Sequence, residues 1–146
     1  MIFDKLLTVS SAQAVTSSAV STDVIDLSKA MDIGEGEDLY MHFSVDTAVA
    51  AAGAATVEFQ IIGSSAAAMT SPVVLGSTGP IGKADLVIGK QIAVRINPQI
   101  ASLGFRYLSA NYSVATGPLT AGAFTAGIVH DIQDGHKSYA AGYSVL

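Results

Sequence analysis

The chain has 146 residues, about the size of one domain, and it contains no cysteine. Disulfides, thiolate zinc sites and cysteine nucleophiles are therefore excluded. Twelve acidic against seven basic residues give a net charge of −5. There is no cluster of Lys and Arg and no apolar run of about 20 residues, so we expect no contact with nucleic acid and no membrane span.

Charged residues are scarce. They make up 13% of the chain, against about 25% in an average soluble domain, and the mean hydropathy is +0.49. An isolated monomer relies on surface charge to stay apart from its copies. We therefore expect a partner to cover part of the surface, in a homo-dimer or homo-trimer or on another protein. The alternative is that many small Ala, Gly and Ser residues raise the hydropathy without forming an apolar patch.

The first expected segment is an N-terminal arm. Leu6–Ser21 consists mainly of Ser, Thr, Ala and Val with little periodicity, which is compatible with an extended arm, an edge strand or a short helix. We expect a flexible arm over about residues 1–21. Ala12-Gln13-Ala14 has the form of a signal-peptidase site, but the apolar run before it is too short and Asp4 is acidic, so secretion is not expected.

Alternation of apolar and polar residues predicts the strands that follow. In Leu39–Asp46 the odd positions are apolar, which places His42 on the outer, solvated face. Thr56–Ile61 and Gln91–Ile96 repeat the pattern, and Pro98 ends the latter because proline cannot donate to a strand ladder. In chain order, the predicted strands are 23–27, 39–46, 56–61, 73–75, 91–96, 105–114 and 120–130.

Glycine and proline separate these strands. Turns are predicted at 34–36, 63–65, 77–80 and 116–118. Ala48–Ala55 is rich in alanine but is interrupted by Gly53, so a long hairpin loop with room for a helical turn is expected there. Short strands without crossover helices favour an all-β, antiparallel, jelly-roll-like β-sandwich, and residues 1–146 are expected to form it as one domain.

Two groups of residues have the chemistry of metal ligands. Asp32–Asp38 alternates acidic residues with glycines as calcium loops do, but it lacks the EF-hand spacing and the distal glutamate. His130 and His136 flank Asp131 and Asp134, yet spacing alone does not make ligands converge. We expect a solvated acidic turn in the first case and a polar turn in the second, with no metal and no other cofactor.

A catalytic site is not expected. A serine nucleophile normally lies in a sharp turn of the G-x-S-x-G type, which the sequence lacks. His130 and Asp131 could pair as a base and its orienting acid, but adjacent residues of a strand face opposite sides. Neither a G-x-G-x-x-G motif nor a P-loop occurs. The chain is therefore predicted not to be an enzyme.

Candidate interface residues come from the aromatic side chains, because Tyr and Arg are enriched at binding hot spots. Phe105 and Tyr107 are assigned to the core, whereas Arg106 and Tyr112 are assigned to an interface.

The last sixteen residues, about 131–146, are predicted to be a docking tail that the fold does not need. They show neither strand alternation nor a helical stripe, and ordering each backbone unit costs about 1–2 kcal/mol. Tyr139, Tyr143 and Leu146 are the predicted anchors of this tail, either on the domain's own surface or on a neighbour's.

Several short segments, taken in their order and spacing along the chain, resemble those of a known family. They are Met1–Asp4, Gln13–Thr16, Val24–Leu27, Asp32–Tyr40, Arg106–Leu108, Tyr112–Val114, Gly117–Gly122 and Val129–Gln133. Together they resemble the Bbp16-like bacteriophage capsid cement proteins. The resemblance implies an oligomeric, jelly-roll-like sandwich on the outside of an icosahedral head, where it clamps neighbouring major capsid subunits without enzyme activity. The alanine-rich stretches Ala48–Ala55 and Ser64–Ser71 match no part of this pattern.

The expected function is therefore that of a cement or decoration protein at the capsid surface of a virion, assembled in the host cytoplasm. Its expected partners are the major capsid protein and further copies of itself. The alternative is a carbohydrate-binding β-sandwich of a phage particle, such as a receptor or lectin-like module. Sugar sites usually present exposed aromatic platforms, and the chain has no tryptophan and only 7% aromatic residues, which favours the cement protein.

Overall fold

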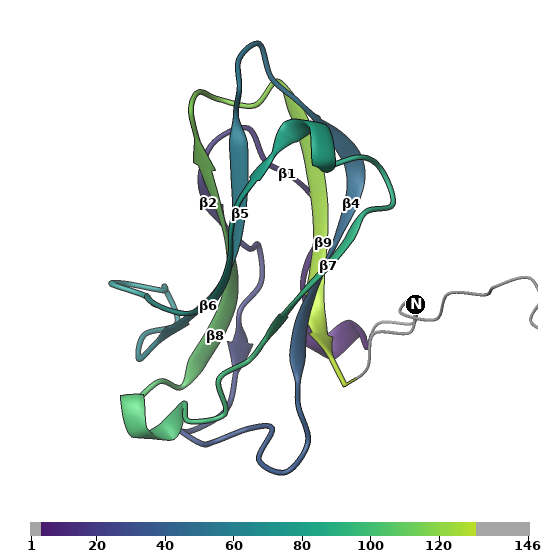
Figure 1. Cartoon of the computed structure of the whole chain (residues 1–146). Coiled ribbons are helices and arrows are strands. Elements are labelled where there is room, and N and C mark those ends of the chain that lie inside the picture. The colour runs from purple at the N-terminus through teal and green to yellow at the C-terminus, as the bar shows by residue number, and fades with distance from the viewer. Residues whose placement is uncertain (1–3, 131–146) are drawn as a thin grey trace, which may run out of the picture.

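The computed structural model describes residues 4–130 of the chain (Figure 1). Within this range nine strands are joined by loops and three short 3-10 helices, none of which is long and apolar enough to cross a membrane. The strands are β1 (Thr8–Ala14), β2 (Ala19–Val20), β3 (Ile25–Asp26), β4 (Tyr40–Ala50), β5 (Thr56–Ser64), β6 (Val73–Gly82), β7 (Gln91–Arg95), β8 (Tyr107–Ala115) and β9 (Ala121–Val129). The helices are η1 (Lys5–Leu7), η2 (Lys83–Asp85) and η3 (Ala101–Leu103).

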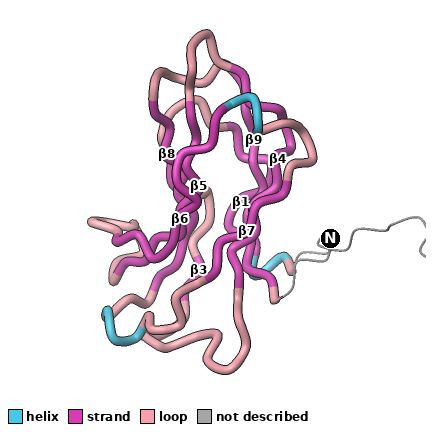
Figure 2. The backbone as a smooth tube through the Cα atoms, in the orientation of Figure 1, coloured by secondary structure: helices cyan, strands magenta, loops and turns pink. Residues whose placement is uncertain are grey.

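The strands form two sheets in which every pair is antiparallel. One sheet has four strands in the order β1-β9-β4-β7. The other has five, in the order β2-β8-β5-β6 with β3 also paired to β8. The two sheets face each other as the two layers of a sandwich (Figure 1 and Figure 2). The predicted all-β, antiparallel sandwich is confirmed.

The strand order is that of a jelly roll. The chain pairs with itself in a nested way: β1 with β9, β2 and β3 with β8, β4 with β7, and β5 with β6. Successive nested pairs belong to alternate sheets. Because the outermost pair joins β1 to β9, with Thr8 opposite Gly127, the described chain begins and ends at the same end of the sandwich.

Apolar side chains from the facing sides of both sheets fill the space between them. Phe43 and Phe124 from one sheet meet Phe59 and Tyr112 from the other at the centre. The ring centroids of Phe59 and Phe124 lie 5.1 Å apart, and those of Tyr112 and Phe124 lie 5.2 Å apart. Such pairs add about 0.5–1.5 kcal/mol beyond the burial of their area. The interior is thus occupied by the protein's own side chains, and binding to other molecules takes place at the surface.

The inward positions predicted for β4 are correct, but the prediction for His42 is wrong. Its side chain is only 1% exposed, and its Nε2 lies 2.9 Å from Oε1 of Gln91 on β7. Across the sheet it faces Ala93 of β7 and Gly127 of β9, and these small residues leave room for the imidazole ring against the sheet. Alternation assigns a side chain to a face of a strand, but it does not tell what covers that face.

The expected flexible arm over residues 1–21 is also wrong from Thr8 onward, where the chain is the edge strand β1. This strand pairs with β9, and Val9 is fully buried. On the edge of β1 that faces away from β9, Asp23 N donates a hydrogen bond to Val9 O at 2.8 Å. Two register shifts interrupt the pairing of β1 with β9. Bulges of this kind destroy a period of two, which is why the segment lacks periodicity.

Two strands run through predicted loops. β4 continues to Ala50, so the loop predicted at 48–55 is shortened to 51–55. β6 continues through 77–80, where the sequence predicts a turn. Pro80 is tolerated there because β6 lies at the edge of its sheet and register shifts interrupt its pairing with β5.

Candidate interaction site

Tyr112, predicted at an interface, lies in the core, so that assignment is wrong. Its side chain is 0% exposed, its ring stacks on Phe124, and its hydroxyl lies 2.5 Å from Oγ of Ser10. Burial raises the pKa of the phenol, against the hydrogen bond with Ser10, which lowers it. The reason is visible in the strand itself, since Leu108, Ala110 and Tyr112 alternate on the inward face of β8.

Arg106 lies at the surface, but its guanidinium group is bound within the chain. Its Nε and Nη2 each donate to a carboxylate oxygen of Asp26 at 2.6 Å, and its guanidinium carbon lies 5.1 Å from the centre of the Tyr107 ring. The hydrogen bond from Arg106 lowers the pKa of Asp26. Phe105 packs against the core as expected, whereas Tyr107 is half-buried outside it. The side chain of Arg106 is 43% exposed, and its role at an interface stays a prediction.

The remaining predicted anchors, Tyr139, Tyr143 and Leu146, lie outside the described residues. The same holds for Asp131, Asp134 and His136, which the second metal hypothesis requires. The described chain ends at His130, which lines two neighbouring depressions of the surface.

An apolar hollow lies at the end of the sandwich where the chain enters β1 and leaves β9. It has a volume of about 250 Å³, somewhat below the roughly 300–1,000 Å³ of typical small-molecule sites. Val129 and His130 stand at the point where the chain leaves it. Its other lining residues are Leu7, Ile25, Leu27, Ile33, Leu39 and Ile128. They come from η1, β3, the loop before β4 and β9, so both sheets contribute to the hollow. Its size and lining suit an apolar side chain.

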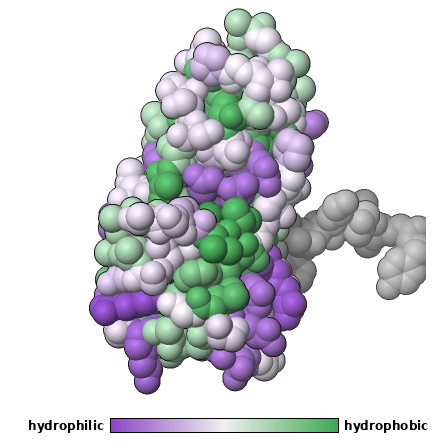
Figure 3. Space-filling view, turned by 90° about the vertical axis from the view of Figure 1, so that its left-hand side faces the viewer, coloured by the Kyte–Doolittle hydropathy of each residue, from purple (hydrophilic) through white to green (hydrophobic). Residues whose placement is uncertain are grey.

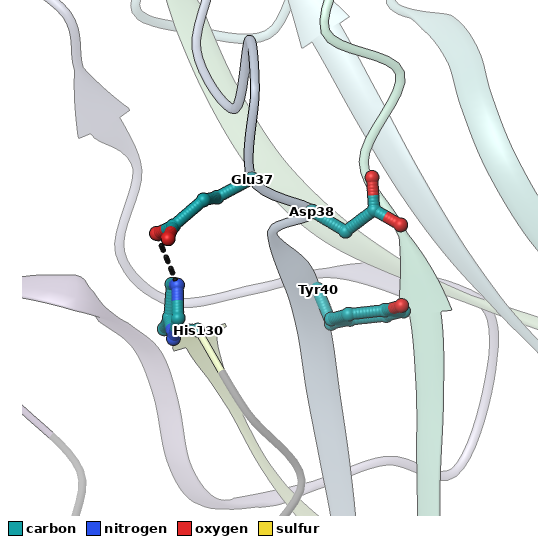
Figure 4. Close-up of a pocket in the computed structure, with 4 residues that line it drawn as sticks. All are labelled: Glu37, Asp38, Tyr40 and His130. Atoms are coloured by element: carbon teal, nitrogen blue, oxygen red, sulfur yellow. Dashed lines mark hydrogen bonds and ion pairs between the residues drawn. The ribbon is translucent and has the colours of Figure 1, made fainter.

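Charged side chains lie beside this apolar hollow (Figure 4). Glu37, Asp38, Tyr40 and His130 line a second, shallow depression, so His130 is shared by the two. Nε2 of His130 lies 2.6 Å from Oε2 of Glu37, and Nη2 of Arg95 donates to Asp38 at 2.6 Å. Figure 4 shows Glu37 and His130 pointing toward each other. Exposed pairs such as these add little stability, but they give the apolar hollow a charged edge.

The acidic turn at 32–38 distributes its carboxylates among separate partners. Asp32 accepts a hydrogen bond from the backbone N of Ala101 at 2.8 Å. Glu37 contacts His130, the residue after β9, and Asp38 binds Arg95 of β7. In the part of the chain that the structure describes, no three Asp, Glu or His side chains gather as metal ligands do. The turn therefore connects three neighbouring elements.

Exposed aliphatic side chains also occur away from the hollow. Val73 and Val74 open the edge strand β6, and Val87 and Ile88 follow η2. Figure 3 shows the side on which β2, β8, β5 and β6 lie, where apolar side chains gather in the lower half between hydrophilic areas. Sequence reasoning missed these residues. For Val73 and Val74 the signal was available, since two consecutive apolar residues of a strand cannot both face the core.

The comparison with protein families covers the whole sandwich. A family model described as Bbp16 matches residues 9–128, which is most of the chain. The chain belongs to the Bbp16 family. Bbp16 is a phage-related family, and membership supports a phage-associated structural protein. No curated protein matches the chain.

In this Bbp16 chain the match begins within β1 and ends at Ile128 in β9. The matched part is therefore the jelly roll itself. Leu7, Val129 and His130, which complete the apolar hollow, lie just outside the match. The other five lining residues, Ile25, Leu27, Ile33, Leu39 and Ile128, lie inside it.

Proposed function

We propose that this chain is a cement, or decoration, protein of a bacteriophage capsid. It binds the outer surface of the head and stabilises the contacts between neighbouring major capsid subunits. The observation that carries the proposal is a Bbp16 sandwich whose interior is filled by its own side chains, while aliphatic side chains are exposed at separate places on its surface. Such a molecule is suited to bind proteins through its outside.

The exposed aliphatic residues explain how such binding would work. Val73 and Val74 lie on an edge strand, Val87 and Ile88 lie in a loop, and the apolar hollow lies at one end. Each contact is small, but an oligomer attached at several points gains roughly 10²–10⁴ in avidity. The partners are the major capsid protein and further copies of this chain in a homo-dimer or homo-trimer.

The proposal also specifies a location and excludes other activities. The protein resides on the capsid surface of the virion after assembly in the host cytoplasm. It has no catalytic role and contacts neither nucleic acid nor membrane.

Purified virions test this function directly. We expect the protein to co-purify with intact heads at a stoichiometry comparable to that of the major capsid subunit, and heads lacking it to lose their DNA at a lower temperature. Adding the purified protein back should restore the heat resistance of the heads. Virions that lack the protein, or heads whose heat resistance does not depend on it, would contradict the proposal.

The carbohydrate-binding alternative has one observation in its favour. Tyr40 lies beside Glu37 and Asp38 in the shallow depression, so an aromatic ring and two carboxylates share one surface (Figure 4). A glycan array with the wild-type protein and a Tyr40→Ala variant separates the two functions. Glycan binding that the variant loses would favour this alternative over the cement protein.

A further inference from the structure

We propose that the apolar hollow binds the C-terminal segment of its own chain, which folds back after His130 and places the ring of Tyr139 in the hollow. This inference concerns the free protein and does not depend on the proposed capsid function.

The C-terminal segment is attached at the edge of the hollow. Sixteen residues follow His130 in the sequence, and His130 itself lines the hollow. A segment tethered at the edge of a site reaches an effective concentration on the order of millimolar. A second copy of the chain in micromolar solution cannot compete with it. The segment also contains the apolar residues that a hollow lined by aliphatic side chains requires.

The sequence of this segment contains a pair of residues that favours a tight turn. Asp134-Gly135 is a preferred pair for the two-residue turn of a β-hairpin. In such a hairpin Gln133 pairs with His136, and counting outward from the turn places Tyr139 opposite His130. The returning strand would therefore reach the edge of the hollow with an aromatic residue.

The side chain of His130 fixes the direction in which a residue opposite it would point. Phe124, Ala126 and Ile128 are core residues on the inward face of β9, and His130, the residue that follows the end of this strand, lines the hollow. Residues directly opposite each other on paired strands share a face. Tyr139, opposite His130, would therefore point toward the hollow.

A free edge is available for this returning strand. On the side of β9 that faces β1, pairing ends where Thr8 meets Gly127. Among the described residues, no strand pairs with Ile128–His130 on that side. A strand added there would lie beside η1, whose Leu7 forms part of the hollow.

The chemistry of tyrosine fits the two parts of the site. Its ring suits the aliphatic lining of the hollow, and its hydroxyl group can stay at the edge, where Glu37 and His130 supply polar atoms.

Disulfide trapping tests the proposal in the full-length chain, which contains no cysteine of its own. Leu7→Cys is combined with Ala141→Cys, so that Tyr139 is retained. The matched control combines Ala52→Cys with Ala141→Cys, because the β4–β5 loop lies at the opposite end of the sandwich (Figure 1). Under mild oxidation we expect a bridged monomer to form about tenfold or more faster in the first pair, in line with the high effective concentration of a docked segment. Adding Tyr139→Ala to that pair should abolish the advantage.

Three results would overturn the proposal: equal rates in the two pairs, an advantage that survives Tyr139→Ala, or bridged dimers as the main product, which would mean that the segment binds a second copy. A methyl NMR spectrum of the otherwise wild-type chain adds an independent measurement. We expect the ring-current shift of the Ile33 methyl groups to disappear in Tyr139→Ala and to persist in Phe3→Ala. The reverse outcome would mean that the N-terminal residues fill the hollow and the proposal is wrong.

Discussion

Replacing Tyr112 by phenylalanine separates the core role of this residue from an interface role. The substitution keeps the ring against Phe124 but removes the hydroxyl that lies 2.5 Å from Oγ of Ser10, and both residues are fully buried. Ser10 is then left with a buried hydroxyl that has lost its partner. Leaving one such group unsatisfied costs about 1–3 kcal/mol, whereas removing both partners can be nearly neutral. An exposed interface tyrosine would change stability by only about 0.5 kcal/mol.

Urea denaturation followed by circular dichroism measures this cost. With an m-value of about 2 kcal/mol/M, the midpoint of Tyr112→Phe should fall by about 0.5–1.5 M. Ser10→Ala should show a comparable loss, and the double variant should recover most of it. If the two single losses simply add in the double variant, the two hydroxyl groups are not coupled and the assignment fails.

The pH dependence provides a second check on the same residue. The pKa of Tyr112 is raised in the folded protein by burial, so the unfolded chain releases this proton first as the pH rises through about 10. The unfolding free energy then falls with increasing pH. The Tyr112→Phe variant has no phenol at this position and does not lose stability in this way. The difference in unfolding free energy between the wild-type protein and the variant should therefore narrow above about pH 10. A constant gap would contradict the buried phenol.

Four further outcomes are expected. Arg106→Ala should raise the pKa of Asp26 toward its ordinary value in an NMR titration, and an unchanged titration would contradict the ion pair. Because the pKa of Asp26 is lowered in the folded chain, the ion pair stabilises the fold at pH values above the ordinary pKa of an aspartate. This stabilisation is lost as the pH falls through the lowered pKa. EDTA should leave the melting temperature unchanged, whereas calcium bound at 32–38 would add about 2.7 kcal/mol at a hundredfold excess over Kd. Sedimentation at micromolar concentration should show a dimer or trimer, and a clean monomer without capsid affinity would count against a partner-covered surface. Truncation after Gln133 should leave the β signal in circular dichroism intact, and unfolding would instead make the tail part of the sandwich.

Periodicity predicted the fold where strands are regular and half-buried. β5 and β7 lie close to their predicted positions because each presents one face to the core and the other outward. Strand β1 was not predicted because its bulges break the alternation of apolar and polar residues. Pro80 was misread as a turn because the sequence does not show that β6 is an edge strand. Irregular pairing and sheet order are tertiary facts, and a local pattern does not contain them.

The candidate site was harder to predict than the fold. Tyr112 was assigned from the general preference of tyrosine for interfaces, although its place in the alternation of β8 indicates the core. The apolar hollow joins Leu7, Ile25 and Ile128, which only the nested pairing of the jelly roll brings to one end. The spacing of these residues along the chain does not indicate that they lie close together in the fold.

The scarcity of charge can now be connected to particular surfaces. A low charged fraction could simply reflect a core rich in aliphatic and aromatic residues, and the filled interior accounts for part of it. The exposed pairs Val73–Val74 and Val87–Ile88 are not explained in this way. They lie on different elements, Val73–Val74 at the start of β6 and Val87–Ile88 in the loop between η2 and β7. Separate small apolar contacts are what a protein requires when it touches several neighbours at once, because each is weak alone and their combination gives the affinity.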